Sequence, residues 1–390
     1  MKIVADENIL LVKELFTAFG DVVTLPGKEI SSAIVKDADI LLVRSVTKVN
    51  AALLAESSIR FVGTATIGTD HLDLSYLEQK SIAYASAPGC NAEAVVEYVL
   101  SAVFSLAQQN DFLPLEKSWA IVGCGNVGGL LYKKLQSLGI RVCTYDPFLA
   151  ASNDIKTVDY DAVFQCDIIS FHTPLTYSGP YPTYHMLTSE QLNKIKPGTV
   201  LLNSGRGEVF DHHALLNFLQ RRNDIYVVLD VWENEPNIDK FLVPFVDIAT
   251  AHIAGYSAQG KRKASMMICH ALQSFLGKSK STLDIVDSLI EKEIVVHADS
   301  FQQAILRAVT GSYDIFLDDQ CLRTLVDASS MNEIGDNFES IRKSYHFRPE
   351  YSSIRITLEY AASENNLQQE KALLTIRAAL STLGFRMAAN

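Results

Sequence analysis

Residues 119–146 of this 390-residue chain, WAIVGCGNVGGLLYKKLQSLGIRVCTYD, carry the clearest indication of its fold. A short apolar run leads into the glycine pattern GCGNVG at residues 123–128, and leucines then recur at helical spacing over residues 130–138. A second apolar run, RVCTY at residues 141–145, supplies the next strand. A strand, a glycine turn, a helix and a strand in direct succession predict a Rossmann-type, doubly wound α/β domain.

Each glycine of this turn meets a need of dinucleotide binding. Gly123 permits the tight turn, Gly125 lets the backbone approach a pyrophosphate, and Gly128 allows the helix to pack closely on the strand. At the start of the helix, the N–H groups around Asn126 and Val127 can meet phosphate oxygens.

Asp146 ends the second strand, where a ribose-binding acid belongs. Its carboxylate can accept hydrogen bonds from the adenosine ribose hydroxyls. It would repel a 2′-phosphate by roughly 4 kcal/mol at about 4 Å in an effective dielectric near 20. The cofactor is therefore expected to be NAD rather than NADP. The alternative is a tight strand-to-helix turn followed by an exposed aspartate.

Strands and helices alternate on both sides of this stretch. The first 86 residues hold the strand-like runs KIVA, DILLVRS, IRFVGTA and IAYAS, and the runs DIISFHTP, TVLLNSG, YVVLDVW and DIATAHI follow residue 146. Helical patterns join the two regions and follow the last of these runs. The last 110 residues mix two helical patterns with one alternating strand, SSIRITLEY, which predicts an α+β domain.

Three polar residues follow the ends of three successive strands: Arg206 in SGRG, Glu235 in ENEP and His252 in HIAG. The carboxyl ends of parallel strands share one edge of the sheet, where ligands bind. A dehydrogenase of 2-hydroxy acids needs a cation for the carboxylate, a base for the hydroxyl proton and a group that orients the base; Arg206, His252 and Glu235 fit these needs in that order. Each residue taken singly could instead be a loop arginine, a surface glutamate or a buried histidine.

Composition limits the possible partners. The formal net charge is −11 and there is no basic run, so general nucleic-acid binding is not expected. The six cysteines are scattered without zinc-ligand spacing, so we expect no metal site and a reduced, cytoplasmic compartment. We also expect no signal peptide and no membrane segment.

Together these motifs resemble the D-isomer-specific 2-hydroxyacid dehydrogenase family over residues 1 to about 280. The resemblance implies a flavodoxin-like substrate-binding domain of residues 1–92 plus 257–280 and an NAD-binding Rossmann domain of residues 93–256. It also implies catalytic roles for Arg206, Glu235 and His252.

Five stretches resemble one branch of that family: MKIVADEN, RSVTKVN (44–50), GTATIGTDHLD (63–73), APGCNAEAVVEYVLSA (87–102) and GPYPTYHMLT (179–188). With this match, the resemblance extends over the whole chain. It implies NAD-dependent oxidation of 4-phospho-D-erythronate to 2-oxo-3-hydroxy-4-phosphobutanoate in pyridoxal 5′-phosphate biosynthesis. It further implies that residues 281–390 form a dimerisation domain, so that the chain is a homodimer.

The resemblance also assigns binding roles. Ser45, Thr66 and Tyr256 are similar to substrate contacts of the family. The implied NAD contacts are Asp146, Thr173, Ser204, Gly205, Arg206, Asp230 and Gly255. One departure is Thr69 and His71 in GTDHLD, where related dehydrogenases usually have a small apolar residue and Asn.

The substrate phosphate needs a local cation in an acidic protein. Arg44, beside Ser45, is our first candidate, and Arg348 or His346 in SYHFRPEY is a second. His185 has no carboxylate partner suggested by its spacing, so we interpret it as a packing or loop residue.

Two other functions stay open. The chain could act on another phosphorylated 2-hydroxy acid, such as 3-phosphoglycerate, because the chemistry is shared. It could also be an NAD-sensing, corepressor-like protein that keeps the dehydrogenase fold for partner binding.

Overall fold

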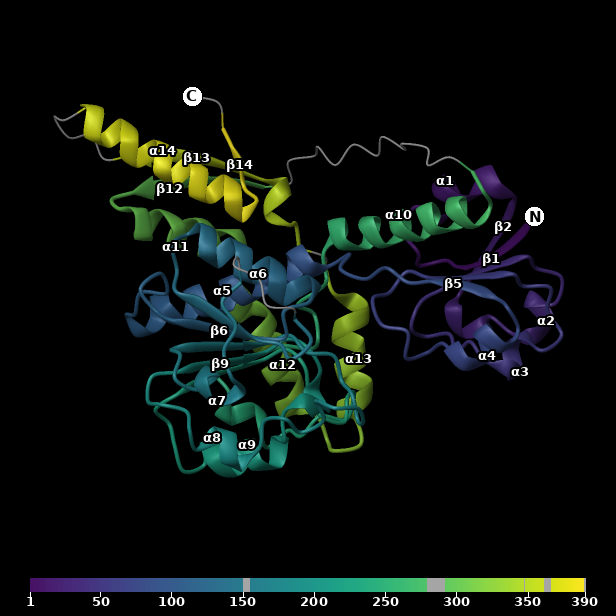
Figure 1. The fold of residues 1–390 in the computed structure, drawn as a ribbon, viewed down its shortest axis with the longest axis horizontal. Coiled ribbons are helices and arrows are strands. Elements are labelled where there is room, and N and C mark those ends of the chain that lie inside the picture. Colours follow the sequence, from purple (N-terminus) through teal and green to yellow (C-terminus); the bar gives the residue numbers. More distant parts are fainter. Residues whose placement is uncertain (150–154, 279–291, 347, 361–365, 389–390) are drawn as a thin grey trace. The chain divides into compact units, whose positions relative to one another are not determined.

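The computed structural model describes residues 1–149, 155–278, 292–346, 348–360 and 366–388 (Figure 1). The chain divides into two compact units. Unit 1 is formed by Met1–Asn91 and the described residues of Ser257–Asp287. Unit 2 is formed by Ala92–Tyr256 and the described residues of Ser288–Asn390.

Unit 1 contains one parallel sheet with the order β2-β1-β3-β4-β5. Its strands are β1 (Lys2–Asp6), β2 (Asp21–Leu25), β3 (Ile40–Val43), β4 (Phe61–Thr64) and β5 (Ala83–Ala85). This is the flavodoxin-like order, in which ligands bind beyond the carboxyl ends of the strands. The flavodoxin-like expectation is confirmed.

Helices cover both faces of this sheet, which explains why β3 and β4 are buried along their whole length. On one face, α1 (Val12–Phe16) and α10 (Ala258–Phe275) share a core with β1, β3 and β4. On the other face lie α2 (Ser32–Val35), α3 (Ala51–Leu54) and α4 (Leu74–Gln79). The chain therefore returns to unit 1 through α10 to complete its core.

Unit 2 is built around a central parallel sheet with the order β11-β10-β9-β8-β6-β7. Its strands are β6 (Trp119–Val122), β7 (Val142–Tyr145), β8 (Ile168–Phe171), β9 (Val200–Asn203), β10 (Tyr226–Leu229) and β11 (Ile248–Ala249). This is the Rossmann order with its outermost strand reduced to one bridge between Thr144 and Thr157. Every strand expected from residue 119 onward is confirmed.

The central sheet is covered on both faces (Figure 1). One face packs on α5 (Ala92–Asn110) and α6 (Asn126–Ser137). The other packs on α7 (Tyr160–Val163), α8 (Ser189–Leu192) and α9 (His212–Leu219). The α5 helix is buried along most of its length, because the C-terminal region of the chain covers the side that the sheet leaves open.

That C-terminal region has its own parallel sheet, ordered β12-β13-β14. It comprises β12 (Lys292–Ala298), α11 (Phe301–Ser312), α12 (Ile315–Ala328), α13 (Ile334–Ser344), β13 (Ile354–Tyr360), α14 (Asn366–Leu383) and β14 (Arg386–Met387). The expected strand is β13, and the structure adds β12 and β14 on its two sides. Because α11 packs on α5 and α12 on β11, this region shares its core with the Rossmann part.

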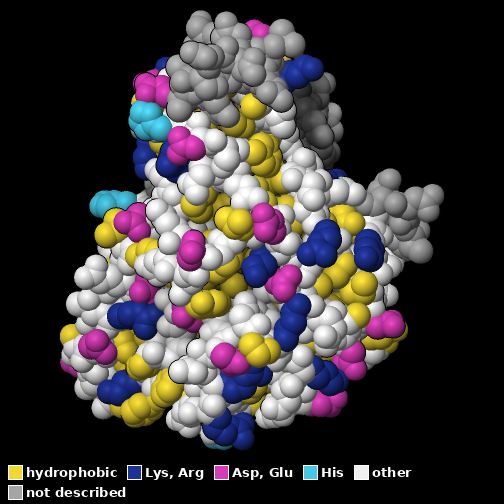
Figure 2. Space-filling view, turned by 90° about the vertical axis from the view of Figure 1, so that its left-hand side faces the viewer, with side chains coloured by type: hydrophobic (Ala, Val, Ile, Leu, Met, Phe, Trp, Pro, Cys, Tyr) yellow, Lys and Arg dark blue, Asp and Glu magenta, His cyan; other side chains and the backbone are white. Residues whose placement is uncertain are grey.

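The described helices include none that is long and apolar enough to cross a lipid bilayer. On the face shown in Figure 2, basic and acidic side chains are interspersed, and neither kind gathers into a patch among the described residues drawn there. This surface matches the mixed charge pattern of the sequence.

Candidate active site

His252 and Glu235 form a hydrogen-bonded pair at the carboxyl edge of the central sheet. Nδ1 of His252 lies 2.7 Å from Oε2 of Glu235. The backbone N–H of Trp232 donates to the other carboxylate oxygen at 2.8 Å, which fixes the glutamate. Because an ionised carboxylate can only accept, Nδ1 carries a proton, and in the neutral form of the imidazole the lone pair is on Nε2.

The loop that carries His252 is held by Asp230, which directly follows β10. The Asp230 carboxylate is buried and accepts hydrogen bonds from the N–H groups of Ile253 at 2.7 Å and Ala254 at 3.0 Å. Its backbone carbonyl accepts from the N–H of His252 at 2.7 Å. These bonds hold His252 in a left-handed conformation with φ of 56°, which turns the chain sharply after β11.

Burial alone would raise the pKa of Glu235, because it disfavours the charged form. The positive charge and hydrogen bond of His252, the N–H of Trp232 and the charge of Arg342 together hold that pKa below its ordinary value. Glu235 is therefore ionised at neutral pH and acts as the acceptor for His252.

Arg206 lies on the loop after β9, and this loop packs directly on the loop that carries Glu235. A Cβ on Gly207 would come within 1.9 Å of the Trp232 carbonyl carbon, so only glycine allows this approach. The Arg206 side chain is half-buried, and one Nη donates to the Gly205 carbonyl at 2.9 Å. The structure thus brings the loops of Arg206, Glu235 and His252 to one edge, as the sequence predicts.

The glycine turn has the shape that a dinucleotide phosphate requires. Gly123 has φ of 89°, and a Cβ on Gly128 would lie 1.9 Å from the Gly123 carbonyl oxygen. Gly125 is different, since no described heavy atom lies within 4 Å of where its Cβ would stand. Open space at Gly125, together with the N-terminal N–H groups of α6 at Asn126 and Val127, fits a pyrophosphate.

Asp146 directly follows β7 and is half-buried. Its carboxylate accepts hydrogen bonds from the N–H of Cys124 at 2.9 Å and the N–H of Phe148 at 3.0 Å. The bond to Cys124 ties the expected ribose acid to the glycine turn. The position fits the ribose of NAD.

The loops after β8 and β9 lie against each other. A Cβ on Gly205 would come within 3.0 Å of the Thr173 carbonyl oxygen, and Ser204 Oγ lies 3.4 Å from Nδ1 of His172. The hydroxyl of Thr173 is buried and has no hydrogen-bond partner among the residues that the structure describes. An orphaned hydroxyl at this edge fits a bound cofactor, which is the role expected for Thr173.

Tyr256 closes the histidine loop beyond Gly255, where its N–H donates to the Ile253 carbonyl at 2.8 Å. The guanidinium of Arg342, from α13, lies 6.0 Å from its ring centroid, and the Tyr345 ring packs edge-on. A helix of the C-terminal region therefore reaches the predicted substrate contact Tyr256.

In unit 1, the predicted substrate contacts follow the strand ends. Arg44 and Ser45 come directly after β3, and Thr66 follows β4. The hydroxyl of Thr66 donates to the Gly68 carbonyl at 2.9 Å and lies 2.7 Å from the hydroxyl of Thr64, which in turn lies 2.9 Å from Nε2 of His71. The unusual His71 thus supports the threonine pair.

Lys261 is a cation that sequence reasoning missed. It lies in the first turn of α10, four residues after Ser257, which caps the helix by accepting from the N–H of Gly260 at 2.9 Å. Burial, together with the nearby positive charge of Arg44, lowers the pKa of Lys261 to about 8, although the negative charge of Asp6 opposes this shift. Its place after Tyr256 at a helix start is the sequence signal that could have found it.

His185 makes loop hydrogen bonds, and one of them is to a carboxylate that its spacing in the sequence did not suggest. Its Nε2 lies 2.6 Å from Oε1 of Glu233, and its N–H donates to the Glu208 carbonyl at 2.8 Å. The residues are far apart in sequence, so spacing gave no sign of the contact. The pair ties the 179–188 segment to the loops of Arg206 and Glu235.

Arg348 does not have the placement expected of a phosphate ligand. It is buried, and its Nη groups donate to the backbone carbonyls of Ala94 at 2.6 Å, Ile253 at 3.2 Å and Ala254. The guanidinium is thus used to hold the histidine loop on α5 rather than to meet a ligand.

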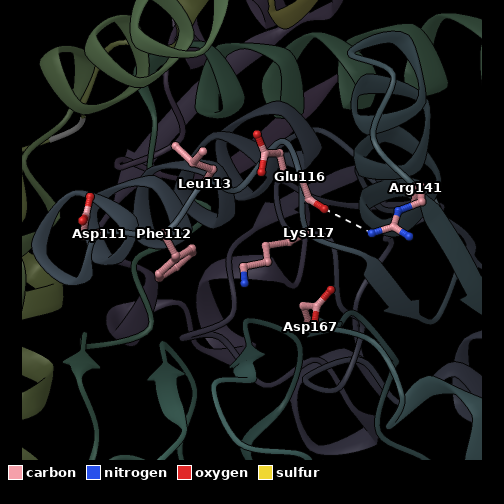
Figure 3. A pocket seen from close by; sticks show the side chains of 7 residues that line it. All are labelled: Asp111, Phe112, Leu113, Glu116, Lys117, Arg141 and Asp167. Carbon is pink, nitrogen blue, oxygen red and sulfur yellow. Dashed lines mark hydrogen bonds between the residues drawn. The ribbon is translucent and has the colours of Figure 1, made fainter.

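A hollow of about 450 Å³ lies elsewhere, near the amino ends of β6, β7 and β8 (Figure 3). It is lined by Asp111, Phe112, Leu113, Glu116, Lys117, Arg141 and Asp167. Arg141 donates to the Glu116 carbonyl at 3.2 Å, as the dashed line in Figure 3 shows. The hollow contains none of the predicted site residues. Among the described residues, no group of three or more His, Cys, Asp and Glu is placed to hold a metal ion.

Comparison with protein families gives two matches. Residues 91–254 match the NAD-binding domain of D-isomer-specific 2-hydroxyacid dehydrogenases. Residues 289–371 match a domain of unknown function, DUF3410.

Curated proteins match nearly the whole chain. The erythronate-4-phosphate dehydrogenase of Teredinibacter turnerae is 46% identical over 360 residues, which cover 92% of this chain and 95% of that protein. The enzyme of the same name from Cellvibrio japonicus is 42% identical over 394 residues, covering 99% of this chain and all of that protein.

Solved structures match the part of the chain with the dehydrogenase fold. NAD⁺-bound 3-phosphoglycerate dehydrogenase from Entamoeba histolytica is 25% identical, with a TM-score of 0.61, and the match covers 73% of this chain and 98% of that one. D-lactate dehydrogenase from Aquifex aeolicus, in complex with NAD and lactic acid, is 21% identical, with a TM-score of 0.59, and the match covers 71% and 96%. The latter likeness shows the fold alone.

Proposed function

Because the chain belongs to the family of erythronate-4-phosphate dehydrogenases, within the D-isomer-specific 2-hydroxyacid dehydrogenases, we propose that it oxidises 4-phospho-D-erythronate to 2-oxo-3-hydroxy-4-phosphobutanoate with NAD. This reaction is a step in the biosynthesis of pyridoxal 5′-phosphate. The observation that carries the proposal is the 2.7 Å contact between His252 and Glu235 on loops that pack beside Arg206.

His252 is the base of the proposed reaction. Glu235 accepts the hydrogen bond of Nδ1–H, so Nε2 is free to take the proton of the C2 hydroxyl. The resulting imidazolium is stabilised by the carboxylate of Glu235. Asp230 contributes by holding the loop of His252 rigid, and its role as an NAD contact stays a prediction.

Arg206 binds the substrate carboxylate, because a guanidinium can donate two parallel hydrogen bonds and keeps its charge. The same charge stabilises the carbonyl oxygen that develops at C2. NAD, when bound, accepts the hydride that leaves C2. The residues that would hold it are Gly123, Gly125, Asn126, Val127, Gly128, Asp146, Thr173, Ser204, Gly205, Arg206, Asp230 and Gly255.

Cations of unit 1 are proposed to bind the substrate phosphate. Arg44 and Lys261 lie close enough for the positive charge of Arg44 to lower the pKa of Lys261. A phosphate dianion bound near both side chains would offset the repulsion between their positive charges. Ser45 and Thr66 are the proposed hydroxyl contacts in the same unit. Tyr256 of unit 2 stays a predicted substrate contact.

We further propose that the chain forms a homodimer through the C-terminal region and works in the cytoplasm, where reducing conditions keep thiols free. Cys124, Cys143, Cys166, Cys269 and Cys321 carry free thiols in the structure, as this proposal requires.

The test is NADH formation by the purified chain with 4-phospho-D-erythronate, with 3-phosphoglycerate and with unphosphorylated erythronate, followed by product mass. We expect the highest kcat/KM with 4-phospho-D-erythronate. Higher activity with 3-phosphoglycerate would support the alternative dehydrogenase, and no turnover of any 2-hydroxy acid would support the corepressor-like alternative.

Variants of the two cations test whether Arg44 and Lys261 bind the substrate phosphate. Lys261→Met and Arg44→Met should raise KM for 4-phospho-D-erythronate at least 10-fold and leave kcat within a few-fold, because each removes one charge-assisted contact. Lys263→Met, an exposed neighbour in α10, is the control. If all three variants kept the wild-type KM, the phosphate would bind elsewhere.

A further inference from the structure

Two cysteines of unit 2 lie in contact outside the candidate active site. Cys143 is buried in β7, and Cys166 is half-buried just before β8. Their Sγ atoms are 3.7 Å apart, and both thiols are free. The hydride-transfer mechanism uses neither residue.

The topology of the sheet explains why residues 23 positions apart meet. Both β7 and β8 pair with β6, one on each side, and Ala120 of β6 is the register partner of Cys143. Ala120 and Cys143 are buried in the same core cluster, and Cys166 packs against it. The thiol contact therefore joins β7 to the segment just before β8, on the two sides of β6.

We propose that Cys143 and Cys166 form a dithiol site that a peroxide oxidises to an intramolecular disulfide. Cys166 is the attacking thiol because it is the accessible one, and Cys143 is the resolving thiol because it is buried at contact distance.

The surroundings of Cys166 favour its thiolate. A hydrogen bond from Cys143, with smaller contributions from Ser118 and the positive charge of Lys196, lowers the pKa of Cys166 to about 7. These effects outweigh burial and the negative charge of Asp167, which act in the opposite direction. Nζ of Lys196 lies 2.9 Å from Oδ1 of Asp167, the next residue in the chain. The same thiol–thiol contact and burial raise the pKa of Cys143, so it keeps its proton until the second step.

Other thiols of the chain contrast with Cys166. Burial raises the pKa of Cys124 and of Cys321, and it raises that of Cys269 to about 11. These thiols are therefore protonated and less nucleophilic at neutral pH.

Oxidation proceeds in two balanced steps. The Cys166 thiolate attacks one oxygen of hydrogen peroxide, the O–O bond breaks, and a sulfenic acid and hydroxide form. The Cys143 sulfur then gives up its proton to the hydroxide and attacks the Cys166 sulfur, the S–O bond breaks, and the oxygen leaves as water after protonation. Two thiols and one peroxide thus give one disulfide and two waters, with two electrons passing from sulfur to oxygen.

The experiment exploits the position of Lys156 between the two cysteines. Trypsin places Cys143 in the peptide 142–156 and Cys166 in the peptide 157–194, so a disulfide joins two separate peptides. The full chain is treated with limiting hydrogen peroxide, alkylated and digested without reductant. We expect these two peptides to be linked, with a mass two hydrogens below their sum, and to separate on addition of dithiothreitol.

Variants separate the two roles. Cys143→Ser should leave a sulfenic acid at Cys166 that dimedone traps, and Cys166→Ser should leave Cys143 unmodified. Cys321→Ser, which removes an exposed thiol, should form the disulfide to the wild-type extent.

The digest of the wild-type chain tests disulfide formation between Cys143 and Cys166 even if a variant fails to fold. Oxidation that appears first at Cys321, or a sulfinic acid at Cys166 with Cys143 still alkylated, would overturn the proposal. The same holds if the linked peptides form only after the chain has been unfolded.

Discussion

Two carboxylates, those of Glu235 and Asp230, hold His252 in the position that its proposed role as a base requires. Glu235 fixes the proton on Nδ1, and Asp230 fixes the backbone that carries the ring. The pairing of Glu235 with His252 could be predicted from the sequence, because both residues follow strand ends and the carboxyl ends of parallel strands meet at one edge of the sheet. The hydrogen bonds from Ile253 and Ala254 to Asp230 could not be predicted, because they depend on the directions of the backbone N–H groups in a sharply turned loop.

Glu235→Gln tests the state of this carboxylate. Since the pKa of Glu235 is lowered in the folded chain, its ionised form stabilises the fold above the ordinary carboxyl pKa, and this contribution is lost as pH falls through the folded value. We expect the variant to lose about 1 to 3 kcal/mol of unfolding free energy at pH near 7. The loss should shrink in acid, as measured by urea unfolding.

Glu190→Gln is the matched control, because Glu190 pairs with Lys194 on the surface with a side chain that is 73% exposed. It should change the stability by less than about 1 kcal/mol. Equal losses in the two variants at every pH would show that the environment of Glu235 contributes nothing special.

At the scale of elements, the glycine turn and α6 are set by local sequence. The turn, the helix and β7 follow one another without a break, so the prediction needed no distant contact. The sequence offers no reason for the second glycine of the Gly128–Gly129 pair. The structure separates them: Gly128 touches the turn, whereas at Gly129 the nearest atom to a Cβ would be the Cys124 carbonyl oxygen at 3.4 Å.

Gly128→Ala and Gly129→Ala should therefore differ. The first forces α6 away from the Gly123 carbonyl and should weaken NAD binding at least 10-fold, because the N–H groups of the helix lose their place. The second should keep NAD affinity and gain up to about 1 kcal/mol of stability from helix propensity. Calorimetric NAD titration and thermal unfolding measure both, and equal NAD affinities would contradict the account.

Arg348 links the C-terminal region to α5 and the histidine loop. Removing its guanidinium with Arg348→Met takes a charged donor away from each of the carbonyls of Ala94, Ile253 and Ala254, and Ile253 keeps the backbone N–H of Tyr256. It also removes a charge close to Glu97, whose pKa is raised by burial and by Glu350. We expect a loss of about 2 to 5 kcal/mol in unfolding free energy.

The control is Arg355→Met, which removes an exposed arginine of β13 that pairs with Glu293. It should cost less than about 1 kcal/mol. If chemical denaturation gave the same midpoint for both variants, Arg348 would not hold the loop. The position of Arg348 could not be predicted from the sequence, because its partners lie about 95 and 250 residues away.

Across the whole molecule, the strands of the sheets could be predicted from the sequence, whereas contacts between distant segments could not. The parallel sheets follow from alternating patterns that each stretch shows by itself, and the structure confirms them. The burial of α5 under α11 depends on contacts between distant segments, as do the pairs His185–Glu233 and Cys143–Cys166. Such contacts leave no periodic signal in either segment.

The homodimer proposal is tested on the full chain by sedimentation equilibrium. We expect a mass of twice 43.0 kDa that is independent of dilution over the micromolar range. A mass of one chain at every concentration would remove the dimer from the account without touching the chemistry of the site.

In the proposed reaction, His252, held by Glu235, takes the proton of the C2 hydroxyl while the hydride leaves C2. This role is tested most directly by single-turnover NADH formation with wild type, His252→Ala and the exposed control His213→Ala at saturating NAD. We expect a rate about 10²- to 10⁴-fold lower for His252→Ala, with NAD affinity unchanged, and the wild-type rate for His213→Ala. A His252→Ala rate equal to that of wild type would contradict this role.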